Sequence, residues 1–263
     1  MSKKEFDKYN SIPSASICAT FADMLNSAPP LGVEPPVESV ISDMVKSGFN
    51  RSEKLLVFHP SFLGESVLKS FPKEEIALST SCKSYLPLLS SYPPSPFFNL
   101  LSFYSGQILS DKKDKDKEYN FLFQKEKVLI IGEKCEFLEI AQQRKFATVH
   151  LCSSEHEIIP FVVKAIKENS ADVIIILSNE FASSVKLSDT KSKKTALALD
   201  YTVKSFFLLK DAIEVYWDKY NVSYAFLPTC GCHNTFFGGR CGKMCPEDMN
   251  IPLYTGYKKS SLL

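Results

Sequence analysis

The sequence lacks a long hydrophobic run, a clear excess of either charge and a glycine-rich phosphate-binding turn. No stretch of about 18 consecutive apolar residues occurs, so we expect no membrane-spanning helix. Thirty-one basic and thirty acidic residues leave a net charge of +1, without a basic stripe interleaved with aromatic residues. We therefore expect neither nucleic acid nor a membrane among the partners of this protein.

The amino-terminal residues are polar and are not followed by the apolar segment of a signal peptide. We therefore expect a cytoplasmic protein. In a reducing compartment its eight cysteines should be buried thiols or metal ligands before they are disulfides.

The chain is long enough for one large domain, with 44% hydrophobic residues among 263. Residues 1–52 are rich in proline and serine and contain an amphipathic stretch at 37–49. We expect this part to form an N-terminal arm with one short helix, packed on a core domain of residues 53–263.

Short apolar runs separated by helical stretches predict an α/β protein with a mainly parallel sheet. The runs are rich in aliphatic residues and do not alternate with polar ones, which is typical of strands buried on both faces. They lie at 54–60, 76–81, 127–134, 147–153, 171–179 and 222–229. Among the intervening segments, 195–220 has its apolar residues at helical spacing and predicts one long helix.

The four histidines and the glycine turns give little indication of catalysis. His59 and His150 lie in apolar strands, where a histidine is usually structural, and His156 is expected on the surface in the first turn of a helix. The strand at 127–134 ends in a single glycine, too few for a dinucleotide-binding turn. No serine or cysteine pairs with a histidine in a way that predicts a catalytic triad.

Four cysteines and one histidine cluster near the carboxyl terminus, in a stretch that also contains several glycines. This stretch reads PTCGCHNTFFGGRCGKMCPEDMNI, and its candidate ligands are Cys230, Cys232, His233, Cys241 and Cys245. Thiolates and imidazole could hold one tetrahedral zinc, although the spacing is not that of a standard zinc site. A zinc site, a disulfide and free thiols all remain open.

The same stretch resembles the last active-site segment of the alkaline phosphatase superfamily, in its type I phosphodiesterase/nucleotide pyrophosphatase branch. In that family a strand ends in Pro-Asp-His-Gly, a later His-Gly follows, and Pro-Glu-Asp-Met leads into a final strand ending in Tyr-Gly. The corresponding residues here are Pro228-Thr229-Cys230-Gly231, Cys241-Gly242, Pro246-Glu247-Asp248-Met249 and Leu253-Tyr254-Thr255-Gly256.

The resemblance implies a three-layer α/β/α sandwich whose strands carry two metal ions and a threonine or serine nucleophile at their carboxyl ends. In this sequence the matching positions hold other residues. Ser61 takes the place of the first ligand, Pro96 that of the nucleophile, Asn179 or Glu180 that of the middle aspartate, Thr229 and Cys230 that of the late Asp-His pair, and Cys241 that of the final histidine. Ser95 lies one residue from the nucleophile position.

Because proline has no nucleophilic atom and hydroxyls do not replace metal-binding carboxylates, we expect a pseudoenzyme with a dismantled two-metal site. Such a protein would act by binding or regulation, with a protein or a small phosphorylated ligand as its partner.

The sequence leaves two alternative functions open. The protein could be a divergent metal-dependent phosphoesterase that uses Ser95 as nucleophile, with Glu180 and thiolates as metal ligands. It could also be a structural or redox-sensitive protein in which Cys230 and Cys241 hold one zinc together with Cys232, His233 or Cys245.

Overall fold

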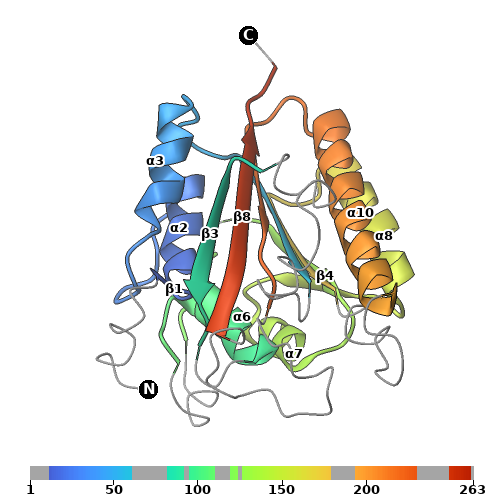
Figure 1. Ribbon diagram of the computed structural model, residues 1–263, viewed down its shortest axis with the longest axis horizontal. Helices are drawn as coiled ribbons and strands as arrows, with labels where there is room; N and C mark the ends of the chain where they lie inside the picture. The colour runs from blue at the N-terminus through green and yellow to red at the C-terminus, as the bar shows by residue number, and fades with distance from the viewer. Residues whose placement is uncertain are drawn as a thin grey trace.

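The computed structural model describes residues 12–60, 82–91, 95–109, 119–123, 126–178, 193–229 and 249–261. Within these residues eight strands form one sheet, in the order β1-β3-β8-β7-β2-β6-β4-β5 (Figure 1). The strands are β1 (Ile12–Pro13), β2 (Lys54–Pro60), β3 (Ser84–Leu89), β4 (Val128–Gly132), β5 (Thr148–Leu151), β6 (Val173–Ser178), β7 (Val222–Phe226) and β8 (Asn250–Lys258). Strand β8 is antiparallel to β3 and β7, and the other neighbouring pairs are parallel, which confirms the mainly parallel sheet.

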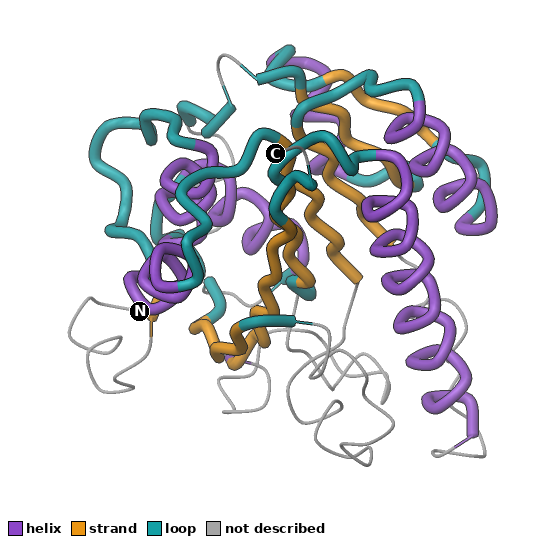
Figure 2. The backbone as a smooth tube through the Cα atoms, turned by 90° about the horizontal axis from the view of Figure 1, so that it is seen from above, coloured by secondary structure: helices purple, strands orange, loops and turns teal. Residues whose placement is uncertain are grey.

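Helices cover both faces of this sheet (Figures 1 and 2). They are α2 (Ser16–Leu25), α3 (Glu38–Lys46), α6 (Pro96–Ser105), α7 (Glu136–Arg144), α8 (Glu155–Lys167) and α10 (Lys193–Tyr216). No helix in the described part of the chain is both long and apolar enough to cross a bilayer.

The central strands explain this layering, because successive side chains of a strand point to opposite faces. In β2, Leu55 and Val57 pack in one buried cluster with residues of α2, α3, α6 and α7. Leu56 and Phe58 pack in a second cluster with residues of α8 and α10. The molecule is therefore a three-layer α/β/α sandwich, as the sequence predicted.

The predicted elements and the observed ones agree best in the centre of the sheet. Strands β2, β4, β5, β6 and β7 lie within the predicted ranges, whereas 76–81 falls outside the described residues and neither β1 nor β3 was predicted. The long predicted helix corresponds to α10, which ends at Tyr216, so that 217–220 form a turn. In the N-terminal region the structure adds α2 to the one predicted helix, α3.

Candidate functional site

Three parallel strands in the middle of the sheet end side by side. Pro60 at the end of β2 is in register with Ser178 at the end of β6. On the other side of β2, the chain continues beyond β7 in an extended form, with the Leu227 amide donating to the Phe58 carbonyl and the Thr229 amide donating to the Pro60 carbonyl. This carboxyl edge is where ligands of open parallel sheets bind, and it places Thr229 directly beside the end of β2.

Helix α6 begins at the same edge, with Ser95 as its N-cap. The extended backbone of Ser95 (φ −147°, ψ 151°) lets its Oγ accept a hydrogen bond from the Phe98 amide at 3.2 Å. Pro96 follows at the first helical position, where a missing N–H costs nothing. Both residues thus have an ordinary role in starting a helix.

The same arrangement leaves the helix with little capacity to bind an anion. A helix N-terminus attracts phosphate because its first amides lack partners. Here Pro96 has no amide hydrogen, and the Phe98 amide is already bonded to Ser95. Of the first three helical residues, only Phe97 has an amide that is not accounted for in this way.

Asn99, one turn into α6, joins the helix to two strand ends. Its fully buried side chain accepts a hydrogen bond from the Ser91 amide at 2.8 Å and donates one to the Thr229 carbonyl at 2.8 Å. A third contact joins Asn99 Nδ2 to Ser90 Oγ at 2.9 Å. We call Ser90, Ser91, Asn99 and Thr229 the Asn99 clasp, because one amide group fixes the chain after β3 and the chain after β7 to the start of α6.

Two hydroxyls of the Asn99 clasp are buried without a hydrogen-bond partner among the described residues. They are Ser91 Oγ and Thr229 Oγ1, and both residues are 2% exposed. Among the described residues, Trp217 Nε1 is also buried without a hydrogen-bond partner. A buried hydroxyl without a partner costs roughly 1–3 kcal/mol, so such hydroxyls are uncommon in native structures. Here they mark the carboxyl edge as a place where a bound group could supply the missing hydrogen bonds.

His59 lies in β2 just before this edge and is held as a neutral imidazole. Its Nδ1 donates to the Leu227 carbonyl at 2.7 Å, which leaves Nε2 to accept from the Tyr104 hydroxyl at 2.6 Å. Burial lowers the pKa of His59 to about 4, and the hydrogen bond to Leu227 opposes only part of this shift. With both ring nitrogens occupied, His59 is structural, as the sequence predicted.

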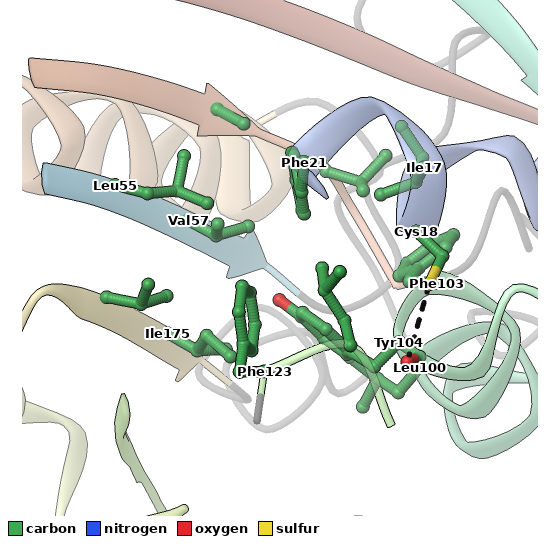
Figure 3. Packing of buried hydrophobic residues seen from close by; sticks show 14 of the residues in the cluster. Ile17, Cys18, Phe21, Leu55, Val57, Leu100, Phe103, Tyr104, Phe123 and Ile175 are labelled. Atoms are coloured by element: carbon green, nitrogen blue, oxygen red, sulfur yellow. Dashed lines mark hydrogen bonds between the residues drawn. The ribbon is translucent and has the colours of Figure 1, made fainter. Parts of the chain in front are cut away.

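The hydroxyl partner of His59 is also part of the core. Figure 3 shows Tyr104 between α2 and the sheet, near Phe21 and Phe123. The Cys18 thiol donates to the Tyr104 carbonyl at 3.7 Å, and burial raises the pKa of Cys18 to about 12, so the thiol remains protonated. These contacts position the end of β2 and offer no free acid, base or nucleophile.

The other two histidines in the described residues also have the predicted roles. His150 in β5 stacks on Phe161 of α8, with ring centroids 3.4 Å apart and planes 7° apart. His156 is exposed in the first turn of α8.

Three candidates from the sequence lie together at the carboxyl edge, namely Ser95, Pro96 and Thr229. Ser95 and Pro96 start α6, and Asn99 of the same helix binds the backbone of Thr229. The other candidates lie outside the described residues: Ser61, Asn179, Glu180, Cys230, Cys232, His233, Cys241 and Cys245.

No sequence pattern predicted a role for Ser90, Ser91 or Asn99. Asn99 lies three residues after Pro96, the residue at the nucleophile position, and this proximity was the one sequence signal that pointed to it.

The described side chains of this edge do not fit a two-metal centre. Divalent cations in such centres are neutralised by carboxylates and imidazoles, whereas Ser91, Ser95, Asn99 and Thr229 supply neutral hydroxyls and an amide. In the described ranges no group of three histidine, cysteine, aspartate or glutamate side chains could hold a metal ion.

Comparison with solved structures agrees with this architecture. A protein in the alkaline phosphatase superfamily from Vibrio parahaemolyticus matches with a TM-score of 0.55 and 10% identity, over 78% of this chain and 60% of that one. The soluble domain of lipooligosaccharide phosphoethanolamine transferase A from Neisseria meningitidis matches with a TM-score of 0.54 and 11% identity, over 80% and 78%. The C-terminal periplasmic domain of EcEptC from Escherichia coli, in complex with Zn, matches with a TM-score of 0.50 and 9% identity, over 80% and 73%.

No family model and no curated protein matches the sequence. The structural likeness therefore defines the fold: this chain has the fold of the alkaline phosphatase superfamily, as the resemblance of its sequence predicted.

Proposed function

We propose that the protein is a pseudoenzyme that uses an alkaline-phosphatase fold for binding or regulation. The observation that carries this proposal is the position of Thr229. Thr229 lies beside the end of β2 and occupies the position at which the resemblance calls for the aspartate of the late Asp-His pair. Its hydroxyl is buried with no described partner. A neutral hydroxyl there cannot neutralise a divalent cation.

The start of α6 supports the same conclusion. The nucleophile position holds Pro96, and the neighbouring Ser95 hydroxyl is engaged as a helix cap. A serine nucleophile needs a base or a metal to activate it, whereas the hydrogen bond described for the Ser95 hydroxyl is the one that it accepts from the Phe98 amide. A divergent phosphoesterase with Ser95 as nucleophile is therefore the weaker candidate.

We infer that the ligand is a small phosphorylated molecule that is bound without hydrolysis. The buried hydroxyls of Ser91 and Thr229 favour an acceptor-rich ligand, because they could donate to its oxygens. Helix α6 adds little positive potential, so we expect modest affinity. A cytoplasmic location remains part of the proposal.

Turnover of a generic aryl phosphate diester tests the absence of catalysis. The protein is assayed with zinc, manganese or magnesium, together with Ser95→Ala and the control Ser154→Ala. Ser154 is the N-cap of α8, and its side chain makes no capping hydrogen bond. We expect no turnover above the buffer rate in any sample. Turnover that Ser95→Ala abolishes and Ser154→Ala preserves would overturn the proposal in favour of a phosphoesterase.

Binding is tested separately, by calorimetric titration with phenyl phosphate. Thr229→Val removes the hydroxyl but keeps the backbone contacts to Pro60 and Asn99. We expect the variant to bind several-fold more weakly than the wild type, while Ser47→Ala at the exposed end of α3 binds normally. Equal binding by all three proteins would contradict a ligand at the carboxyl edge.

A further inference from the structure

A hollow lies at the amino-terminal edge of the sheet, opposite the carboxyl edge. It has a volume of about 680 Å³ and is lined by the starts of β4 and β5, the last turn of α7 and the second half of α8. A volume of this size is typical of sites for small organic ligands. We call it the amino-edge pocket; the Asn99 clasp lies at the other edge of the same sheet.

Part of the lining of the amino-edge pocket is apolar. Val128, Leu129 and Ala165 form part of its lining and are largely buried. Phe146 and Phe161 also line it, and each is partly exposed.

Both aromatic walls are held from behind by other rings. Phe146 stacks on Phe121, with centroids 4.1 Å apart and planes 16° apart. Phe161 stacks on His150. The pocket walls are therefore fixed before any ligand enters, which lowers the entropic cost of binding.

Charged side chains surround this apolar surface. Three lysines and two glutamates line the pocket, so the lining has one net positive charge (three minus two). Glu168 lies 3.9 Å from Lys164, and Glu126 accepts a hydrogen bond from the Ser27 hydroxyl. Both carboxylates therefore have a partner, whereas Lys145 forms no ion pair with any residue that the structure describes.

A simpler explanation for these lysines is that they complement the negative ends of α7 and α8. The last carbonyls of α8 do not require them. The Lys164 carbonyl accepts from the Glu168 amide, the Ile166 carbonyl from the Asn169 amide, and the Ala165 carbonyl from the Ser170 amide. Lys164 lies 3.9 Å from Glu168, so Lys127 and Lys145 are the lysines of the lining that form no ion pair with a described residue.

We propose that the amino-edge pocket binds one small organic anion with an apolar body, such as a medium-chain carboxylate. The apolar body would lie against Phe146, and the anionic group would contact Lys127 and Lys145 at the rim. Charge complementarity and an apolar, preformed wall favour this class over a neutral or cationic ligand. The proposal is independent of the function assigned to the carboxyl edge.

Calorimetric titration of the whole chain with decanoate tests this proposal. The double variant Lys127→Gln/Lys145→Gln removes the two rim charges. The matched control is Lys46→Gln, which removes a lysine from the last turn of α3, outside the pocket. Decan-1-ol serves as the neutral ligand of equal length, and circular dichroism checks that each variant is folded.

We expect saturable binding of one decanoate per chain, weakened at least fivefold in the double variant and unchanged in Lys46→Gln. Decan-1-ol should bind more weakly than decanoate to the wild type and equally well to all folded variants. Absence of saturable decanoate binding by the wild type would overturn the proposal. An unchanged double variant, or equal weakening in Lys46→Gln, would place the binding elsewhere and would also overturn it.

Discussion

Replacing Asn99 with alanine should destabilise the protein by about 4 kcal/mol, because the substitution leaves two buried backbone groups without partners. The Ser91 amide and the Thr229 carbonyl each bond to the Asn99 side chain at 2.8 Å. Leaving such a group unsatisfied costs roughly 1–3 kcal/mol each. The loss is large beside a total stability of about 5–15 kcal/mol for a typical domain.

Urea unfolding followed by circular dichroism measures this effect, and two further variants separate its causes. Ser90→Ala should cost less, because the Ser91 amide and the Thr229 carbonyl keep their bonds to Asn99. Asn99→Asp has nearly the same shape but, when ionised, cannot donate to the Thr229 carbonyl. It should therefore be strongly destabilising at pH 7 and less so relative to the wild type near pH 4, where the carboxyl group is protonated.

A loss below about 1 kcal/mol in Asn99→Ala would refute this reasoning, since it would mean that the clasp contributes little more than one ordinary hydrogen bond. The same conclusion would follow if Ser90→Ala and Asn99→Ala were equally destabilising.

Three further perturbations test other parts of the structure. The pKa of His59 is lowered to about 4 in the fold, so below pH 6.5 the unfolded chain binds more protons than the folded one. About 2 kcal/mol of stability should therefore be lost between pH 6.5 and pH 5. A pKa near 6.5 for His59 in an NMR titration of the folded protein would contradict this. Gly106→Ala should lower the free energy of unfolding by about 1–3 kcal/mol more than Gly32→Ala does, as measured by thermal or urea unfolding. Both glycines have φ near +70°, but of the two only Gly106 has a neighbouring side chain, that of Val33, which the new Cβ would overlap. Equal losses would show that this overlap does not contribute. Ser95→Ala should lower the unfolding free energy by about 1 kcal/mol through the lost helix cap, and an unchanged value would show that the cap contributes nothing.

The centre of the fold could be predicted because its strands are buried on both faces. All seven residues of β2 and all six of β6 are buried, and such strands appear in the sequence as continuous apolar runs. Strand β3 has the sequence SYLPLL, in which exposed residues alternate with partly buried ones and a proline interrupts the run. Its sequence therefore lacks the signal that identified the others.

Helix α2 was not predicted because it is too deeply buried, whereas β3 was not predicted because it is partly exposed. Eight of its ten residues are buried, and they include serine and threonine as well as aliphatic residues. A helix that is buried nearly all round has no single apolar stripe, so the helical period is hard to see in its sequence.

The site was predictable only in outline. Ser95, Pro96 and Thr229 were identified through the family resemblance, which supplied the positions but not the contacts. The Asn99 clasp depends on a side chain that bonds to a carbonyl 130 residues away in sequence. No local pattern in a single sequence predicts such a contact, because it exists only once α6 and β7 are placed at the same edge of the sheet.

Metal content of the freshly purified protein, measured by plasma mass spectrometry together with a thiol titration, tests most directly whether the two-metal centre has been dismantled. If the centre has been dismantled, fewer than two divalent ions per chain are expected. One zinc ion with protected thiols would assign a metal to the 230–245 cysteine cluster. No metal together with reactive thiols would show that this cluster binds none. Two tightly bound divalent ions per chain would contradict the account, because they would require a set of anionic ligands that Thr229 and its neighbours do not supply.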